Sequence, residues 1–330
     1  MFDYFQNDKD EHPETNTIGV QVKFDLPADY PFLSIERLEF DKGALLHYTG
    51  LESYEKFISV FQTLGHAVNY LNYFRSTVVK ISTQNQFLLM LTKLRQDYDY
   101  LHLSRLCGVS VSTAENIFIT WVNFCSRQWN DVNVWMPQEI VRYFSPSDFK
   151  IKYPATRVML DGTEIPIKKP SNPTAQRATF STYKNRNTVK TVIGASPGGL
   201  VSYISATYGG GSASDRQIIE RSGIAQMCKA GDHIMCDKGF NVQDLFALYD
   251  VTINIPSFFK KKNRLTGHRV LQDRKIASKR VHIERIIGLG KTYKILCNGL
   301  SSSETAIARH IIFICYFLCN LKKNIVPRTA

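Results

Sequence analysis

The chain has 330 residues, of which 44% are hydrophobic and 21% are charged, and it carries 41 Lys and Arg against 29 Asp and Glu. This length is sufficient for two domains with buried cores, and the hydrophobic share excludes a wholly disordered protein. The 19 Gly and 12 Pro exclude a collagen-like or linker protein. The net charge of +12 favours a polyanionic partner.

The first residues and the cysteines indicate the compartment. Residues 1–30 contain seven acidic residues and two lysines, so we expect a disordered acidic tail rather than a signal peptide. The seven cysteines include no Cys-x-x-Cys pair, and we expect them to be reduced in an intracellular protein. The longest apolar run, Ile311–Cys319, is shorter than the roughly 20 residues that span a bilayer, so no membrane association is expected.

Residues 31–150 have the apolar spacing of helices, and about 85–125 predicts a helix-turn-helix. A short helix over Leu101–Cys107 is followed by Gly108, which suits a tight turn. A capping box, Ser112-Thr113-Ala114-Glu115, predicts the start of the next helix. The alternative interpretation is a helical corner in a bundle that does not bind DNA.

The helix that follows the turn, Ser112–Cys125, would be the one that enters a DNA groove, but it contains no Lys or Arg. Thr113 and Asn116 have side chains that are able to contact base edges. Strong phosphate binding is therefore not expected from this helix, which favours the helical-corner alternative.

After about residue 150 the pattern changes to short apolar runs separated by helices, which predicts an α/β domain over 151–330. A hairpin is predicted around Pro197-Gly198-Gly199, and a helix from Ser214 through Ile224. The remaining predicted strands are Arg157–Asp161, His233–Cys236 and Val251–Ile255.

Two predicted strands end at an acidic residue, Asp161 and Asp237. Ligands of open α/β sheets bind at the carboxyl ends of strands, so these carboxylates are placed for function. A third acid, Glu284, lies in a predicted helix beside isoleucines that would hold it on a rigid backbone. Three ionised carboxylates repel one another unless cations lie between them, and their oxygens suit two Mg²⁺ or Mn²⁺ ions. A turn or a solvated helix face explains each acid taken singly.

Glu284 lies in the most basic part of the chain, because residues 256–294 contain twelve Lys and Arg and two acidic residues. Acids for metal surrounded by bases for phosphate are what cutting a nucleic-acid backbone requires. A solvated cationic helix is the alternative. The candidate phosphate-binding residues are Lys260, Lys261, Lys262, Arg280 and Arg285.

Six motifs follow one another over residues 156–296. They are Leu160-Asp161-Gly162-Thr163-Glu164-Ile165-Pro166-Ile167, Phe180-Ser181-Thr182-Tyr183-Lys184, Gly209-Gly210-Gly211-Ser212, Ser214-Asp215-Arg216, Cys236-Asp237-Lys238-Gly239-Phe240 and Arg280-Val281-His282-Ile283-Glu284-Arg285. In this order they resemble the motifs of DDE superfamily transposases and endonucleases, most closely the PIF/Harbinger-like branch, and the preceding helix-turn-helix resembles the segment that this family carries there.

The resemblance implies an RNase H-like core, with a mixed sheet of about five strands and flanking helices. Asp161 would lie on the first strand and Asp237 on the neighbouring fourth strand, with Glu284 on a helix. These acids would be catalytic metal ligands in the hydrolysis and transfer of DNA strands. Asp215 is expected to cap a helix or to support the ligands, and His282 to be structural, to orient Glu284 or to touch a phosphate.

Members of this family recognise transposon ends through an N-terminal zinc finger or a separate Myb-like protein. No Cys/His set with zinc spacing precedes residue 100, so we expect such a partner, or a module that this chain lacks, to supply specificity. Nuclear localisation and a homodimer on paired DNA ends are also implied. The alternative function is a domesticated transposase that binds DNA without cleaving it, although the presence of all three acids favours the active nuclease.

Overall fold

The computed structural model describes residues 31–78, 80–237, 239–255 and 267–327, and of residues 267–277 it describes the backbone alone. Residues 31–330 form one compact unit. Two predictions lie outside the described residues, namely the disordered acidic tail over 1–30 and the phosphate-binding role of Lys260, Lys261 and Lys262.

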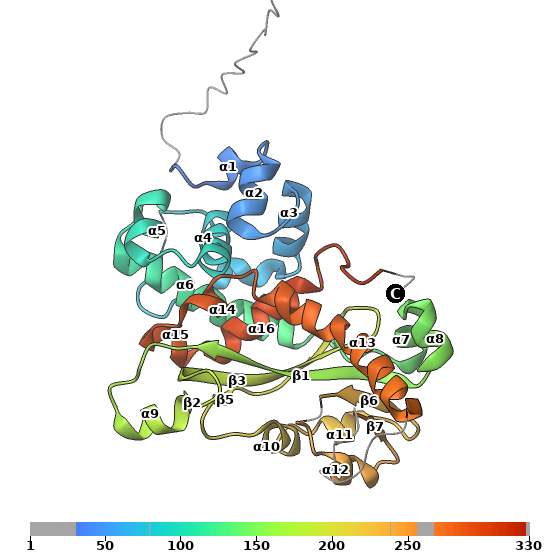
Figure 1. Cartoon of the computed structure of the whole chain (residues 1–330). Coiled ribbons are helices and arrows are strands. Elements are labelled where there is room, and N and C mark those ends of the chain that lie inside the picture. The colour runs from blue at the N-terminus through green and yellow to red at the C-terminus, as the bar shows by residue number, and fades with distance from the viewer. Residues whose placement is uncertain (1–30, 79, 238, 256–266, 328–330) are drawn as a thin grey trace, which may run out of the picture. The chain divides into compact units, whose positions relative to one another are not determined.

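Helices make up the first part of this unit (Figure 1). Their core is aromatic: the Phe57 and Phe87 rings lie 5.4 Å apart, and Phe87 lies 5.6 Å from Trp121. All three side chains are fully buried, so burial of large apolar surface holds these helices together. The helices are α1 (Ile35–Leu38), α2 (Lys42–Thr49), α3 (Tyr54–Gln62), the 3-10 helix η1 (Gly65–Tyr70), α4 (Thr83–Gln96), α5 (Tyr100–Cys107), α6 (Val111–Asn130), α7 (Gln138–Phe144) and α8 (Ser147–Lys152).

The helix-turn-helix lies in α4, α5 and α6. Helix α5 ends at Gly108, whose φ of 65° is the left-handed conformation that glycine adopts without strain. The predicted capping box was wrong by two residues, because the side chain of Ser110 accepts the hydrogen bond from the Thr113 N–H and α6 begins at Val111. Ser112 is exposed in the first turn.

A mixed sheet forms the second part, with the strand order β2-β3-β1-β6-β7 and with β4 and β5 also paired to β3. Strand β1 is antiparallel to β3 and parallel to β6, which is parallel to β7. Leaving aside the two-residue β2 and β5, the order is β4-β3-β1-β6-β7, the RNase H-like arrangement that the resemblance implied. The strands are β1 (Thr156–Pro166), β2 (Phe180–Ser181), β3 (Arg186–Ala195), β4 (Val201–Ile204), β5 (Tyr208–Gly209), β6 (His233–Cys236) and β7 (Thr252–Asn254).

Helices cover both faces of this sheet, as Figure 1 shows for α13 and α16 on one side and α10, α11 and α12 on the other. Side chains alternate between the faces: Met159 and Met235 pack in the core with the α13 face, whereas Leu160 and Cys236 pack with α10 to α12. The helices of this part are α9 (Pro173–Thr179), α10 (Asp215–Glu220), α11 (Ile224–Met227), α12 (Gln243–Ala247), α13 (Gly267–Gly290), α14 (Ile295–Asn298), α15 (Ser302–Ala306) and α16 (Ala308–Cys319).

In the second part, two elements end well away from their predicted last residues. The helix expected from Ser214 through Ile224 ends at Glu220, and Gly223 with a φ of 66° precedes the separate helix α11. Strand β1 does not end at Asp161 but continues to Pro166. In the described part of the chain, no helix combines the length and the apolar character that a membrane span requires.

Candidate active site

Asp161 and Asp237 are brought together by the register of two parallel strands. The parallel pairing of β1 with β6 ends at Leu160 opposite Cys236. Asp161 follows Leu160 in the sequence, and Asp237 follows Cys236. Adjacent strands lie about 4.8 Å apart, so the two backbones are neighbours at this position. The prediction that both acids end strands was wrong for Asp161, because it pairs with Ile193 of β3 and this antiparallel ladder continues beyond it. Only the parallel pairing of β1 with β6 stops just before Asp161.

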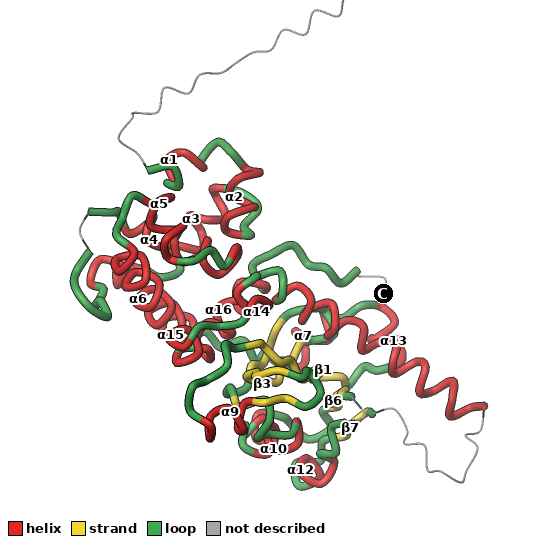
Figure 2. Tube along the Cα trace, turned by 60° about the vertical axis from the view of Figure 1, so that its left-hand side comes forward, coloured by secondary structure: helices red, strands yellow, loops and turns green. Residues whose placement is uncertain are grey.

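The alternation of side chains decides which face carries the acids. Leu160 faces α10 to α12, so Asp161, the next residue, faces the opposite side, where α13 lies beside β1 and β6 (Figures 1 and 2). Ile283 and Ile286 bury one side of α13 in the core and leave Glu284 exposed between them. The sheet and α13 thus position the three acids predicted from sequence around one place.

Arg280 connects these acids. Its guanidinium Nη1 lies 2.9 Å from Oδ1 of Asp237, and its Nη2 lies 4.0 Å from Oε1 of Glu284, one helical turn along α13. The Arg280 side chain is 13% exposed, so its positive charge is partly shielded from water. Arg280 was predicted to bind phosphate, and its spacing of four residues from Glu284 was the one feature of the sequence that indicated a contact with an acid.

The carboxylate of Asp161 is shifted in its titration by its surroundings. Burial raises its pKa from 3.8 to about 6; Arg280 and a hydrogen bond oppose this shift, and the charges of Asp237 and Glu284 add to it. The hydrogen bond comes from the N–H of Gly162, 2.9 Å from Oδ1 of Asp161, and fixes the orientation of the carboxylate. A proton or a cation is therefore favoured at Asp161.

The residues around this place suit a divalent ion in donor chemistry, since carboxylate oxygens are the ligands of Mg²⁺ and Mn²⁺ and a positive charge already lies among them. Within the described residues, however, no three His, Cys, Asp or Glu side chains form a group ready to hold a metal. The cation in this arrangement is Arg280, which contacts Asp237 and lies 4.0 Å from Glu284.

Asp215 lies on the other side of the sheet from Asp161. Ser214 is the N-cap of α10, so Asp215 is not the cap residue but stands in the first turn, where its Oδ2 accepts a hydrogen bond of 2.9 Å from Nζ of Lys190. Its Oδ1 is buried without a hydrogen-bond partner directly over Gly162, where a Cβ would collide with it. A glycine after Asp161 is therefore required by this close approach, and the ion pair of Asp215 with Lys190 joins α10 to β3.

The His282 side chain is buried. The side chain is 4% exposed, and its ring meets Phe149 edge to face with the centroids 5.5 Å apart. Burial, with the charges of Lys279 and Arg285, lowers the pKa of His282 to about 4, so the ring is neutral near pH 7. The expected phosphate contact is not open to a side chain in this position, and packing is what His282 does here.

The two base-reading candidates of the helix-turn-helix differ in position. Asn116 is 2% exposed; its Oδ1 accepts from the N–H of Arg75 and its Nδ2 donates to the Ser76 carbonyl. The prediction that Asn116 reads bases was therefore wrong, because the amide is used to hold the loop before α4. Thr113 is half-buried at the start of α6, with its hydroxyl 2.7 Å from Oγ of Ser110. Arg285, a candidate for phosphate, is exposed on α13.

Comparison with protein-family models gives two matches. Residues 160–320, which include Asp161, Asp237 and Glu284, match the DDE superfamily endonuclease family. Residues 79–127, which include α4, α5 and most of α6, match the helix-turn-helix of DDE superfamily endonuclease. No curated protein and no solved structure matches the chain. Residues 160–320 are therefore similar to a DDE superfamily endonuclease domain, and the preceding residues 79–127 are similar to the helix-turn-helix of that superfamily.

Proposed function

We propose that this chain is a divalent-metal-dependent DNA nuclease, a transposase or transposase-derived endonuclease of the PIF/Harbinger-like branch, with Asp161, Asp237 and Glu284 as its catalytic metal ligands. The observation that carries this proposal is the convergence of the three acids on Arg280. Acids from two strands and a helix that share one positive charge have no evident role in folding, because they lie at the edge of the core and not within it.

Each acid has a distinct part in this proposal. Asp161 and Asp237 would share the ions, and Glu284 would bind the second. When bound, two Mg²⁺ or Mn²⁺ ions supply activation of a water and stabilisation of the leaving oxygen at phosphorus. The Gly162 N–H holds the carboxylate of Asp161 in one orientation. Arg280, once released from Asp237, would have its guanidinium free for a DNA phosphate beside the exposed Arg285.

A second function, DNA binding without cleavage, is favoured by one observation. In the described residues the carboxylates are not assembled as a three-ligand metal site, and Arg280 neutralises two of them. A chain that kept this ion pair in the presence of Mg²⁺ would bind DNA through its basic residues and leave the strand intact.

Recognition of specific DNA ends is proposed to need help from outside this chain. Between Ser112 and Cys125, α6 carries no Lys or Arg, and Asn116 is already used by the loop. A Myb-like or other DNA-binding partner would supply base readout, and a homodimer would hold two ends. A DNA substrate of this kind implies residence in the nucleus.

The test is cleavage of duplex DNA that carries the terminal inverted repeats flanking its own locus, with Mg²⁺ or Mn²⁺ and with EDTA. We expect Glu284→Gln to lower the rate at least about 100-fold, since a catalytic ligand is lost. Glu220→Gln, which changes an exposed carboxylate on α10, is the matched control and should leave the rate unchanged. Metal-dependent cutting that survives in Asp237→Ala would overturn the proposal. Binding with a salt-dependent affinity but no cutting would support the second function.

A further inference from the structure

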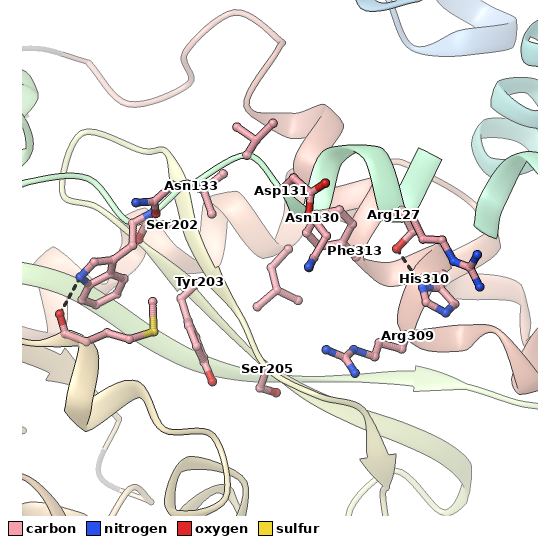
Figure 3. A pocket seen from close by; sticks show the side chains of 16 residues that line it. Arg127, Asn130, Asp131, Asn133, Ser202, Tyr203, Ser205, Arg309, His310 and Phe313 are labelled. Atoms are coloured by element: carbon pink, nitrogen blue, oxygen red, sulfur yellow. Dashed lines mark hydrogen bonds between the residues drawn. The ribbon is translucent and has the colours of Figure 1, made fainter. Parts of the chain in front are cut away.

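A hollow separate from the acids lies where the end of α6 meets the edge strand β4 and the start of α16 (Figure 3). Its volume of about 720 Å³ is in the range of sites that bind small molecules. Strand β4 pairs only with β3 among the described strands, so the hollow borders the outer edge of the sheet. It shares no residue with the proposed metal site.

The charge around this hollow is positive. Arg127 and Arg309 line it, whereas Asp131 is the single acid in its wall as far as the described residues go. Both arginines are exposed, and neither forms an ion pair with a described carboxylate. In Figure 3 the guanidinium of Arg309 extends into the opening toward Ser205. An anion is the ligand that two such side chains favour.

His310 stands between the two arginines as a neutral group. Its Nδ1 lies 2.8 Å from the hydroxyl of Ser126, a contact drawn in Figure 3. Burial lowers its pKa, and the charges of Arg309 and Arg127 lower it further. The positive charge of the wall is therefore that of the arginines, and it persists across the neutral pH range.

The inner wall offers a polar group that lacks a partner within the protein. Ser202 is 4% exposed, lines the hollow, and its Oγ has no hydrogen-bond partner. A buried hydroxyl without a partner is unfavourable, so a ligand that reached it would gain a hydrogen bond. Three aromatic side chains, those of Trp135, Tyr203 and Phe313, also line the hollow.

We propose that this hollow binds one nucleotide unit, with its phosphate at Arg127 and Arg309 and its base against the aromatic side chains. Arginine guanidinium groups suit phosphate oxygens, and aromatic rings accept any base by stacking. A free mononucleotide and an unpaired nucleotide of a DNA strand present the same chemistry. The site goes beyond the proposed nuclease and needs no metal ion.

Tryptophan fluorescence gives a direct test on the full chain in EDTA. The chain has three tryptophans, of which Trp121 and Trp129 are at most 1% exposed, so Trp135 is the one that a ligand in the hollow can reach. The probes are dAMP, a short single-stranded oligonucleotide, a blunt duplex of the same length and inorganic phosphate. Calorimetry repeats each titration without relying on the fluorophore.

We expect dAMP or the single strand to change the fluorescence, and Trp135→Phe to remove that change while calorimetric binding remains. The double variant Arg127→Gln with Arg309→Gln should weaken dAMP binding at least tenfold. The matched control Arg177→Gln, on the exposed side of α9, should not. A single strand that binds much tighter than dAMP assigns the site to DNA, and equal binding assigns it to free nucleotides. Binding of dAMP that is absent at millimolar concentration, no tighter than phosphate, or unaffected by the double variant would overturn the proposal.

Discussion

Arg280 is the residue on which the state of the candidate active site depends. In its ion pair with Asp237, the side chain of the acid is 46% exposed. Water therefore screens this ion pair, which is weaker than a buried one. A divalent ion competes for the same carboxylate with twice the charge. We therefore expect the guanidinium to act as an exchangeable cation that a metal ion is able to replace.

Arg280→Gln should raise the affinity for Mn²⁺ about threefold to tenfold in the absence of DNA, because the ion no longer has to displace a cation worth roughly 1 kcal/mol. Electron paramagnetic resonance of free Mn²⁺ measures this affinity without any cleavage. Arg285→Gln is the control, since Arg285 is exposed on the same helix and one residue from Glu284. An unchanged or weaker Mn²⁺ affinity in Arg280→Gln would show that Arg280 organises the site instead of competing for it.

The raised pKa of Asp161 predicts how stability depends on pH. Below about pH 4 the carboxyl is protonated in both the folded and the unfolded protein; between pH 4 and 6 it ionises first in the unfolded chain, so the folded state loses stability as pH rises. Above pH 6 the loss is complete, on the order of 3 kcal/mol. Asp161→Asn should therefore melt higher than the wild type at pH 7.5 in EDTA and equally near pH 4.

Asp244 provides a control of opposite sign for this measurement. The hydrogen-bonded pair with Arg216 lowers the pKa of Asp244 to about 2, so its contribution is present above pH 4 and disappears as pH falls through about 2. Asp244→Asn should not gain stability at pH 7.5. If Asp161→Asn gave the same difference from the wild type at pH 4 and at pH 7.5, the pH dependence would not come from this carboxyl.

Among single residues, the three acids could be chosen as candidates from the sequence, but their surroundings could not be predicted. Asp161, Asp237 and Glu284 could be selected because each follows or accompanies a buried apolar run. The contact of Arg280 with Asp237 joins α13 to the end of β6, and the approach of Asp215 to Gly162 joins α10 to β1. Such contacts depend on how the elements pack, and the local spacing of residues in the sequence does not predict them.

At the scale of elements, Asn116 illustrates how a helix can lose a residue for recognition. Its amide accepts from the Arg75 N–H at 2.8 Å and donates to the Ser76 carbonyl at 2.7 Å, so α6 anchors the loop that precedes α4. Thr120, one turn further, accepts from the N–H of Phe74. This side of α6 is therefore occupied by the protein's own backbone.

Asn116→Ala should lower the free energy of unfolding by about 2 kcal/mol, because two buried backbone groups lose their partner. Denaturant unfolding followed by circular dichroism measures this loss. Asn123→Ala is the matched control, since among the described residues the Asn123 side chain donates to the Ile119 carbonyl of its own helix. This substitution should change stability by less than about 0.5 kcal/mol. A stable Asn116→Ala protein with lost DNA affinity would instead restore the base-reading role.

Where a strand ends depends on its neighbouring strands, which cannot be identified from the sequence. His233–Cys236 was predicted with its observed bounds, because a buried strand reads as a continuous apolar run. The Asp161-Gly162 pair is typical of a turn, yet the strand continues beyond it, and Gly162 to Pro166 pair with β3 as far as Thr188. An Asp-Gly pair favours a turn only when no long neighbouring strand is present to extend the ladder.

At the scale of the whole molecule, the chain was predicted to divide into a helical domain over 31–150 and a catalytic domain over 151–330. One hydrophobic core, however, contains residues from both ranges. One hydrophobic cluster includes Trp121 and Phe87 of the helices together with Met159 of β1 and Ile311 of α16. The rings of Trp129 and Phe317 stack 4.9 Å apart across the boundary. The last helix of the chain therefore completes the core of the first helices.

Polar contacts cross the same boundary. Nζ of Lys93 on α4 lies 2.9 Å from Oε1 of Glu304 on α15, and both side chains are at most 6% exposed. Nζ of Lys294 donates to Oε1 of Gln96 at 2.6 Å. A buried ion pair that loses one partner leaves a charge without compensation, which costs several kcal/mol. The helix-turn-helix and the nuclease core are thus connected by interactions that neither makes alone.

We therefore expect residues 31–330 to unfold in one cooperative transition, although the chain contains two kinds of architecture. Glu304→Gln should lower the unfolding free energy by about 3 kcal/mol and leave a single transition, because Lys93 then lies buried with only Asp97 as an ionic partner. Calorimetry measures both quantities, and the exposed Glu220→Gln on α10 serves as the control. Residues 31–150 expressed alone should melt without a cooperative transition, since Trp129 loses Phe317 and its burial. Two separate transitions in the full chain, one of them reproduced by the fragment, would show that the helices fold independently and that the shared core adds little.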